Sequence, residues 1–332
     1  MSRRMRNILL ILLAGVLLVC GTAVTIRQKN IQAASIPETY DLARENAAED
    51  LDSFALMKSE PFASDLVISD ANVNTDQLEL AHDDEQALLF DLDNRKALYA
   101  NEIYREIYPA SITKIMTALL CLENGDLSQS VTMTEADFDL DADAQVSDLE
   151  VGDTVTLDQL FHLLVIFSAN DAAMAIARTI GGTVSNFVDM MNTRAQELGM
   201  TETHFVNPDG LHEEDHYTSV YDVYLMLNAV YQYPEYTEAS QMNGYQTKVL
   251  GSDGNTRTIS EHATDEFITG TYGLPNSVKI LASKTGTTSE AGCCLALIVQ
   301  SQSGGTYAAI LMGAWNTDDL YNEMISLLEL IP

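Results

Sequence analysis

The spacing of apolar residues changes near residue 278 of this chain. Between residues 111 and 232 they recur at helical spacing, whereas from 278 to 314 they form short runs typical of strands. The first region predicts helices at 111–123, 157–167, 170–182, 186–198 and 219–232. The second predicts strands at Val278–Ala282, Cys294–Gln300 and Tyr307–Ala314, and a closing helix at Asp318–Leu330.

A predicted hairpin precedes the helical block. The apolar run Ala87–Leu92 is followed by the polar turn Asp93–Arg95 and then by Ala97–Tyr99. A strand pair, a helical block, three further strands and a last helix together predict an α+β fold.

The N-terminus has the features of a membrane signal. Arginines at positions 3, 4 and 6 precede the apolar stretch Ile8–Ile26, which is just long enough to span a bilayer as a helix. The arginines favour a cytoplasmic N-terminus and export of the rest of the chain. Gly21–Ala23 also resembles a signal-peptidase site. A transmembrane anchor and a cleaved signal peptide both remain open, and both place the rest of the chain outside the cytoplasm.

Three regions therefore follow one another along the chain. Residues 1–27 form the anchor or signal peptide, and residues 28–80 are a polar, acidic stretch that we expect to be a spacer. Residues 81–332 are long enough for one folded domain.

The charge balance excludes one large class of partners. The chain has 17 basic and 49 acidic residues, a net charge of -32, so its surface repels the phosphates of nucleic acids. Three cysteines of the predicted domain, Cys121, Cys293 and Cys294, are too few for a disulfide framework. One bridge from Cys121 to either of the others remains open beside buried free thiols.

Two groups of residues have spacings that also occur in metal sites. The first follows the calcium-loop pattern, but its sixth position, which should be glycine, is Ala144. The second is a set of histidines that we expect in a polar loop around Asn207–Gly210. We therefore expect no metal and no cofactor. The groups are Asp139, Asp141, Asp143 and Glu150, and His204, His212 and His216.

Ser111 and Lys114 form the first candidate catalytic motif. At the start of a helix, positions three apart lie one turn above each other, so the lysine amine can take the proton of the serine hydroxyl. The N–H groups and dipole at that helix end favour a developing oxyanion. Taken alone, the pair also fits a capping serine and an exposed lysine.

Two further short motifs follow in the chain. Ser168-Ala169-Asn170 falls between two predicted helices, where a hydroxyl can relay a proton and an amide can bind a peptide group. Lys284-Thr285-Gly286 follows a predicted strand, where a cation and a hydroxyl can bind a carboxylate beside a glycine that allows close approach.

The three motifs in this order occur in penicillin-binding proteins and class A β-lactamases. The longer strings around them resemble the D-alanyl-D-alanine carboxypeptidases, which are low-molecular-mass penicillin-binding proteins of serine peptidase family S11. The resemblance covers about Glu85–Ala314. Its strings are Tyr108–Ala118, Ser168–Ala173, Phe205–Leu211 with His216-Tyr217, and Lys284–Thr288 with Ala291-Gly292.

The resemblance implies a role for each motif residue. Ser111 would be the acylated nucleophile and Lys114 its base, while Ser168 and Asn170 would shuttle the proton and position the substrate. The implied fold is that of the serine β-lactamases, with an antiparallel sheet flanked by helices and an all-helical subdomain. The implied substrates are peptidoglycan stem peptides ending in D-Ala-D-Ala, with β-lactams as acylating inhibitors.

The implied binding residues lie in the third motif and beside the nucleophile. Lys284, Thr285, Gly286 and Thr287 would bind the substrate and its terminal carboxylate, and the N–H groups of Ser111 and Thr287 would form the oxyanion hole.

The chain departs from the family pattern in two places. Many members continue into a β-rich domain and an anchoring helix, whereas this sequence stops at Pro332, which favours attachment through the N-terminal segment. The stretch Thr256–Ser283 lacks an Asn-Arg-Asn string.

Two alternatives differ in chemistry. A class A β-lactamase needs a glutamate with asparagine four residues on, and no glutamate from Glu197 to Glu266 has one. A non-catalytic penicillin-sensing or wall-binding module is the other, and the intact motifs do not favour it. The sequence does not distinguish carboxypeptidase activity from endopeptidase activity on cross-linked stems.

Overall fold

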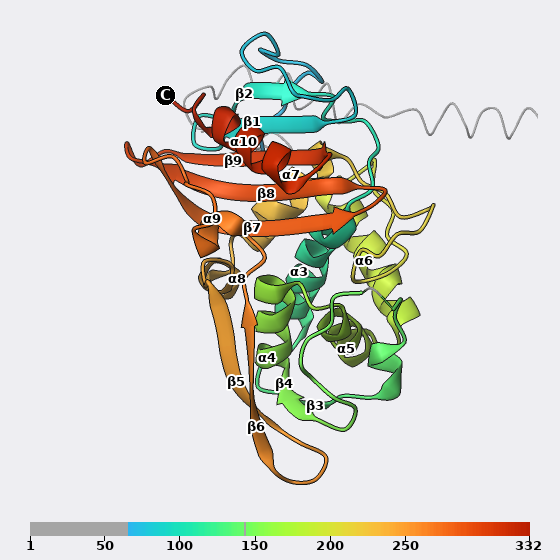
Figure 1. The fold of residues 1–332 in the computed structure, drawn as a ribbon. Helices are drawn as coiled ribbons and strands as arrows, with labels where there is room; N and C mark the ends of the chain where they lie inside the picture. The colour runs from blue at the N-terminus through green and yellow to red at the C-terminus, as the bar shows by residue number, and fades with distance from the viewer. Residues whose placement is uncertain (1–65, 143) are drawn as a thin grey trace, which may run out of the picture. The chain divides into compact units, whose positions relative to one another are not determined.

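The computed structural model describes residues 66–142 and 144–332 (Figure 1). The expected anchor or signal peptide and most of the expected spacer lie outside the described residues, as does Asp143. No helix among the described residues is long and apolar enough to cross a bilayer.

A five-stranded antiparallel sheet forms the centre of the fold (Figure 1). Its order is β2-β1-β9-β8-β7, so the N-terminal hairpin joins the C-terminal meander by pairing β1 with β9, and β7 is an edge strand. The strands are β1 (Gln86–Asp91), β2 (Lys96–Asn101), β7 (Val278–Thr288), β8 (Gly292–Ser301) and β9 (Thr306–Ala314).

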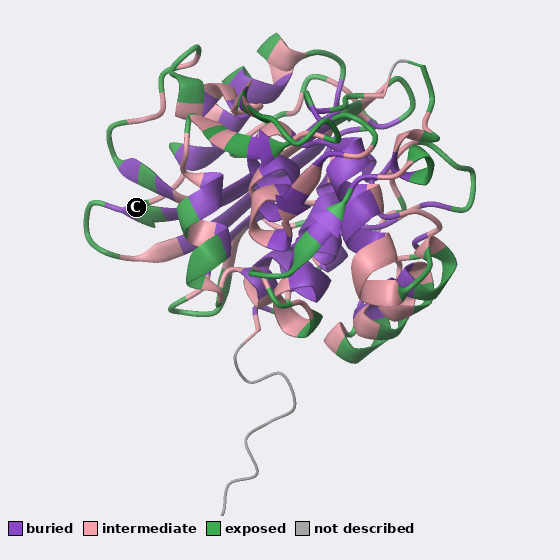
Figure 2. Ribbon diagram, turned by 90° about the horizontal axis from the view of Figure 1, so that it is seen from below, coloured by how far each residue is buried: buried purple, intermediate pink, exposed green. Residues whose placement is uncertain are grey.

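Both faces of this sheet are covered by helices. Along β1, Leu88 and Phe90 point to the core shared with the helical block, whereas Ala87 and Leu89 point to the core formed with the last helix. This alternation explains why the central strands are apolar on both sides and buried along most of their length (Figure 2).

The helical block lies on one face of the sheet, and α10 (Thr317–Leu328) lies on the other. A short 3-10 helix, Ala110–Thr113, leads into α3, and a π-helical segment, Leu163–Phe167, continues α4. The block contains α3 (Lys114–Asn124), α4 (Leu157–His162), α5 (Asn170–Gly181), α6 (Val184–Leu198), α7 (Val220–Val230) and α8 (Pro234–Ser240). The short helix α9 (Glu266–Thr269) precedes β7.

Local capping explains several helix ends. Thr156 and Gln159 form a reciprocal capping box at the start of α4, with N–H to side-chain oxygen distances of 3.2 Å and 2.8 Å. Ser219 accepts from the N–H of Asp222 to begin α7. Gly199 ends α6 in the left-handed conformation, at φ 80°.

A second sheet was not expected from the sequence. It has the order β3-β4-β5-β6 and consists of β3 (Ser130–Thr132), β4 (Thr154–Thr156), β5 (Gly244–Leu250) and β6 (Thr256–His262). Its strands are short or mostly polar, and only Val249 and Ile259 are fully buried in the β5–β6 hairpin. The apolar pattern was therefore too weak to predict them.

The expected α+β fold, an antiparallel sheet flanked by helices, is confirmed. Three details differ from the expectations. The helix expected over 111–123 begins as a 3-10 turn, that over 157–167 ends as a π-helix, and β7 runs to Thr288. Lys284-Thr285-Gly286 therefore lies inside an edge strand and not after it.

The packed domain also begins before residue 81, the boundary expected from composition. Val67 is fully buried, its N–H donates to the Tyr224 hydroxyl at 3.0 Å, and its carbonyl accepts from the Tyr221 hydroxyl at 2.9 Å. Acidic residues between 70 and 85 hid this contact with α7, because composition alone favours a solvated segment.

Candidate active site

Ser111 lies in the 3-10 turn before α3, with its side chain partly exposed. The preceding residue, Ala110, has φ 47°, an unfavourable left-handed conformation for a residue with a side chain. Two glycines support this turn. A Cβ on Gly210 would lie 1.9 Å from the Ala110 carbonyl oxygen, and one on Gly286 would lie 2.9 Å from the Ser111 nitrogen. Close backbone packing therefore fixes the position of Ser111.

Lys114 reaches Ser111 from the first turn of α3. Its Nζ donates to Ser111 Oγ at 2.9 Å, to Asn170 Oδ1 at 2.6 Å and to the Asp209 carbonyl at 2.6 Å. The side chain is 1% exposed. Burial lowers the pKa of Lys114 to about 8, against the opposing effects of Asp209 and Asp171. An amine with this pKa can accept the serine proton near neutral pH.

A second lysine approaches from β7. Lys284 Nζ donates to Ser168 Oγ at 2.9 Å and to the Thr285 carbonyl at 2.8 Å. Burial, and next the charge of Lys114, hold the pKa of Lys284 well below its usual value, although Asp265 opposes this. A charge on Lys114 therefore disfavours a second charge on Lys284.

Ser168 is held in an unusual backbone conformation. It has φ 63° and ψ 33°, directly after the π-helical segment that ends α4. This left-handed turn separates α4 from α5 and places Ser168 and Asn170 at the same end of the block. π-Helical segments and strained residues often occur at functional sites, where tertiary packing offsets their cost.

The edge strand β7 forms one wall of the site. Thr285 Oγ1 and Thr264 Oγ1 are 2.5 Å apart, so one hydroxyl donates to the other. Gly286 packs against the start of the 3-10 turn, where its missing side chain is required by the nearby nitrogens of Ser111 and Ile112.

These residues surround one open cleft of about 580 Å³. The cleft is lined by Ser111, Ser168, Asn170, Thr285, Gly286 and Thr287, while Lys114 and Lys284 lie buried behind the serines. The structure therefore brings together all eight residues selected from the three motifs. The roles assigned to them, including an oxyanion hole at the N–H groups of Ser111 and Thr287, stay predictions.

Several supporting residues were not identified from their chemistry. Asp171 is fully buried and accepts from the N–H and the hydroxyl of Ser147, at 2.9 Å and 2.6 Å, which fixes the loop beside Asn170. The carbonyl of Asp209 contacts Lys114, but a backbone acceptor has no signature in the sequence. Asp209 does lie in a string that resembles the family, and this is the one signal that could have found it.

His216 fixes the loop that carries Asp209. Its Nδ1 accepts from the Val206 N–H at 3.1 Å, so Nε2 carries the proton and donates to Thr113 Oγ1 at 2.8 Å. Burial lowers the pKa of His216 to about 3, and this histidine is neutral at physiological pH. Among the described residues, no group of three or more side chains could hold a metal ion.

The three cysteines of the domain are free and buried, and no disulfide joins Cys121 to Cys293 or Cys294. Burial raises the pKa of the Cys121 and Cys294 thiols to about 12, so neither is a reactive thiolate.

Residues 72–316 match the model of a protein family described as D-alanyl-D-alanine carboxypeptidase, peptidase S11. The D-alanyl-D-alanine carboxypeptidase DacF of Bacillus subtilis is 32% identical over 241 residues, which cover 71% of this chain and 59% of that protein. The D-alanyl-D-alanine endopeptidase of Escherichia coli is 30% identical over 267 residues, which cover 74% of this chain and 76% of that protein.

The crystal structure of the Streptomyces K15 DD-transpeptidase has the same fold. It superimposes with a TM-score of 0.67 at 25% sequence identity, covering 74% of this chain and 95% of that structure. The similarity therefore extends over nearly the whole of that enzyme, whereas the chain spans less than two thirds of the Bacillus relative.

Proposed function

Because the chain belongs to the D-alanyl-D-alanine carboxypeptidase family of serine peptidases, we propose that it removes the terminal D-alanine from peptidoglycan stem peptides. The observation that carries this proposal is the contact of 2.9 Å between Lys114 Nζ and Ser111 Oγ. A buried amine of lowered pKa beside a serine hydroxyl is the arrangement that activates a serine without histidine.

Acylation begins with proton transfer. Neutral Lys114 takes the hydroxyl proton of Ser111, and Oγ attacks the carbonyl carbon of the penultimate D-alanine. The negative charge that develops on the carbonyl oxygen is bound by the N–H groups of Ser111 and Thr287. The carbon–nitrogen bond then breaks and leaves an ester on Ser111.

The leaving amine needs a proton as this bond breaks. Ser168 donates its hydroxyl proton to this amine and regains one from Lys114, which carries the proton taken from Ser111, so Lys114 is neutral again. Lys284 Nζ donates to Ser168 Oγ at 2.9 Å and holds this hydroxyl in place. Water then attacks the ester with Lys114 again accepting a proton. The products are free D-alanine, a shortened stem peptide and the regenerated enzyme.

Binding of the terminal carboxylate depends on β7. Thr285 and Thr287 line the cleft, and the Lys284 amine lies buried behind them, where an approaching carboxylate favours its protonated form. Local cations are needed because a net charge of -32 otherwise repels an anionic substrate.

Release of D-alanine tests the proposal directly. Purified protein is incubated with a pentapeptide ending in D-Ala-D-Ala and, separately, with a cross-linked stem dimer. We expect D-alanine from the pentapeptide, none with Ser111→Ala, and an unchanged rate with Ser252→Ala, which alters an exposed serine in the β5–β6 turn. Activity that survives Ser111→Ala contradicts the proposal, and cleavage of the dimer alone replaces it with an endopeptidase.

We also propose where in the cell this domain acts. A peptidoglycan substrate lies outside the cytoplasm, which agrees with the expected anchor or signal peptide in residues 1–27. We infer that the domain acts on the outer face of the cytoplasmic membrane, or is secreted if the segment is cleaved. The N-terminal sequence of the mature protein and its extraction by alkaline carbonate distinguish these two outcomes.

A further inference from the structure

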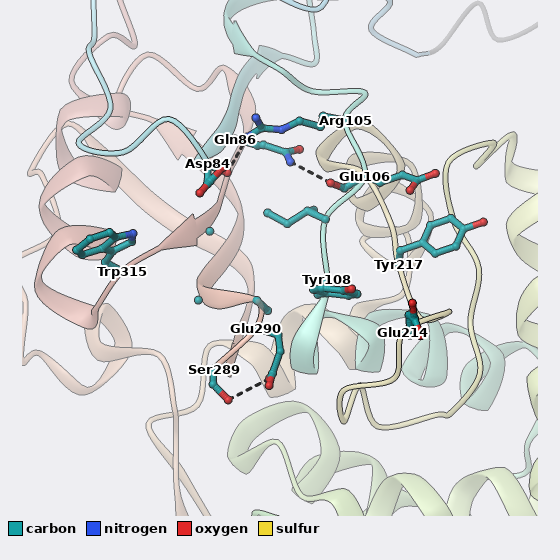
Figure 3. Close-up of a pocket in the computed structure, with 14 residues that line it drawn as sticks. Asp84, Gln86, Arg105, Glu106, Tyr108, Glu214, Tyr217, Ser289, Glu290 and Trp315 are labelled. Atoms are coloured by element: carbon teal, nitrogen blue, oxygen red, sulfur yellow. Dashed lines mark hydrogen bonds between the residues drawn. The ribbon is translucent and has the colours of Figure 1, made fainter.

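A second cavity of about 650 Å³ lies next to the catalytic cleft (Figure 3). The two share Ser289 and Glu290, which form the turn between β7 and β8. The other walls come from the loop before the nucleophile, from the loop after α6 and from the end of β9. Figure 3 shows Tyr108, Glu214 and Trp315 on these walls.

The proposed reaction sets the direction in which a substrate enters this cavity, so the inference rests on that function. The terminal carboxylate is bound at Lys284 and Thr285, and the scissile carbonyl lies beside Ser111 and Thr287. An extended peptide that lies along the free edge of β7 then continues past Thr288 toward Glu290. The residue before D-Ala-D-Ala therefore reaches the second cavity.

The lining of the cavity is strongly acidic. Four exposed acidic residues line it, and none forms an ion pair within residues 66–142 and 144–332. The one lining cation is Arg105, whose Nη2 donates to the backbone carbonyls of Asp83 and Asp84 at 3.2 Å and 2.8 Å, and it balances only one of these four negative charges. The four carboxylates belong to Asp84, Glu106, Glu214 and Glu290.

Aromatic side chains complete the cavity. Tyr108 and Tyr217 are half-buried, and Trp315 is 72% exposed with one face stacked on His82 at 4.0 Å. An aliphatic side chain that ends in a cation suits such walls, since its methylene groups pack on the rings and its charge meets the carboxylates.

We propose that this cavity is the subsite for the residue that precedes D-Ala-D-Ala, and that it selects a side chain ending in a free amine. A stem peptide whose side-chain amine has been acylated, as in a cross-link or an added bridge, loses the attraction of the carboxylates. The enzyme then prefers stems that are not cross-linked through this residue.

Matched peptides test the preference. Two pentapeptides end in Lys-D-Ala-D-Ala and differ only in whether the lysine side chain is free or acetylated. We expect kcat/KM for D-alanine release to be at least about fivefold higher for the free amine, as several exposed charge pairs imply, and the ratio to fall with added salt.

Substitutions of the glutamates that line the cavity test whether they cause the preference for the free amine. Glu290→Gln and Glu214→Gln each lower the ratio by about two- to fivefold. The matched control is Glu238→Gln, an exposed glutamate on α8 outside both cavities, and it leaves the ratio unchanged. Equal ratios in the lining variants and the control contradict the proposal.

Trp315 gives an independent binding measurement, since it is the only tryptophan in the chain. In Ser111→Ala protein, which cannot turn over substrate, the free-amine peptide should change Trp315 fluorescence and bind at least about fivefold more tightly than the acetylated one. Equal affinities overturn the subsite.

Failure of the subsite is distinguishable from failure of the proposed function. If both peptides release D-alanine at the same rate, the subsite is wrong and the reaction stands. If neither releases D-alanine, the reaction is wrong, and the fluorescence titration still decides whether the cavity prefers the amine.

Discussion

Lys114 is the residue on which the proposed chemistry depends. Its ammonium group contacts three oxygen acceptors, Ser111 Oγ, Asn170 Oδ1 and the Asp209 carbonyl, and no carboxylate among the described residues. Neutral acceptors stabilise the charged form less than a counter-ion does, so burial can lower the pKa to about 8. The same contacts fix the direction of the amine toward the serine.

The pKa of Lys114 predicts how acylation depends on pH. Only the neutral amine can take the serine proton, so the rate of acylation by a chromogenic β-lactam should rise from pH 6 and level off above about pH 8. Lys114→Arg should lower this rate about 10²- to 10⁴-fold, because a guanidinium stays protonated. A rate that does not vary with pH between 6 and 9 contradicts the role of Lys114.

The sequence predicted which residues form the candidate site, but it did not predict the backbone conformation of Ser168. Ser111, Lys114 and Asn170 were found because serine, lysine and asparagine are chemically distinctive at those spacings. The left-handed turn at Ser168, with φ 63°, was not expected. Tertiary packing imposes that conformation against the local preference of a serine.

At the scale of elements, the site depends on the contact between β7 and the 3-10 turn that carries Ser111. The motif Lys284–Gly286 was expected after a strand, yet it lies within one, since β7 pairs with β8 from Val278 to Thr288. The polar residues of the motif interrupt the apolar run and hid the continuation of the strand. An edge strand that continues past Ser111 leaves its outer backbone groups unpaired within the sheet, as the proposed binding of a peptide requires.

Gly286→Ala tests this contact. The added Cβ would lie 2.9 Å from the Ser111 nitrogen and 3.0 Å from the Ile112 nitrogen, so the backbone that carries Ser111 must shift. We expect β-lactam acylation to fall about 10²-fold, as small misplacements of reacting groups do.

The matched control for this prediction is Gly273→Ala, because a Cβ on Gly273 meets nothing within 4 Å. This variant should acylate at the rate of the unaltered protein. Equal rates for Gly286→Ala and Gly273→Ala would show that the close approach of β7 is unimportant.

At the scale of the folded domain, a carboxyl pair joins the segment before β1 to α10. Glu323 accepts from the Ala81 N–H at 2.7 Å, and Glu85 accepts from the His82 N–H at 2.9 Å. Glu85 Oε1 and Glu323 Oε2 are buried with no donor among the described residues. Burial, reinforced by Glu85 and Asp319, raises the pKa of Glu323 to about 7. A proton held by Glu323 can therefore be shared by the pair.

This pair predicts a loss of stability with rising pH. The folded state binds the proton of Glu323 more tightly than the unfolded chain, whose glutamate titrates near 4.5, so its contribution falls as pH rises from about 4.5 through about 7. In Glu323→Gln the amide supplies a donor at every pH, and the decline in Tm between pH 5 and 8 should be smaller. Glu329→Gln, an exposed residue at the end of α10, should keep the original decline. Parallel curves for all three proteins contradict this explanation.

The α+β fold of the domain could be predicted from the order of its strands and helices. The start of the domain and the β5–β6 hairpin could not. The contact of Val67 with α7 and the β5–β6 hairpin both lie in polar sequence, where few apolar residues mark the buried side. The cleft also could not be located from composition, because its cations, Lys114 and Lys284, are buried within a protein of net charge -32.

Acylation of Ser111 by penicillin is the most direct test of the proposed serine chemistry. The protein is incubated with penicillin, its intact mass is followed over time, and the modified peptide is sequenced. We predict one penicilloyl group per chain, attached to Ser111, hydrolysed slowly and absent from Ser111→Ala. No adduct, an adduct on another residue, or rapid hydrolysis of penicillin by the unaltered protein would contradict a peptidase that uses Ser111 and Lys114.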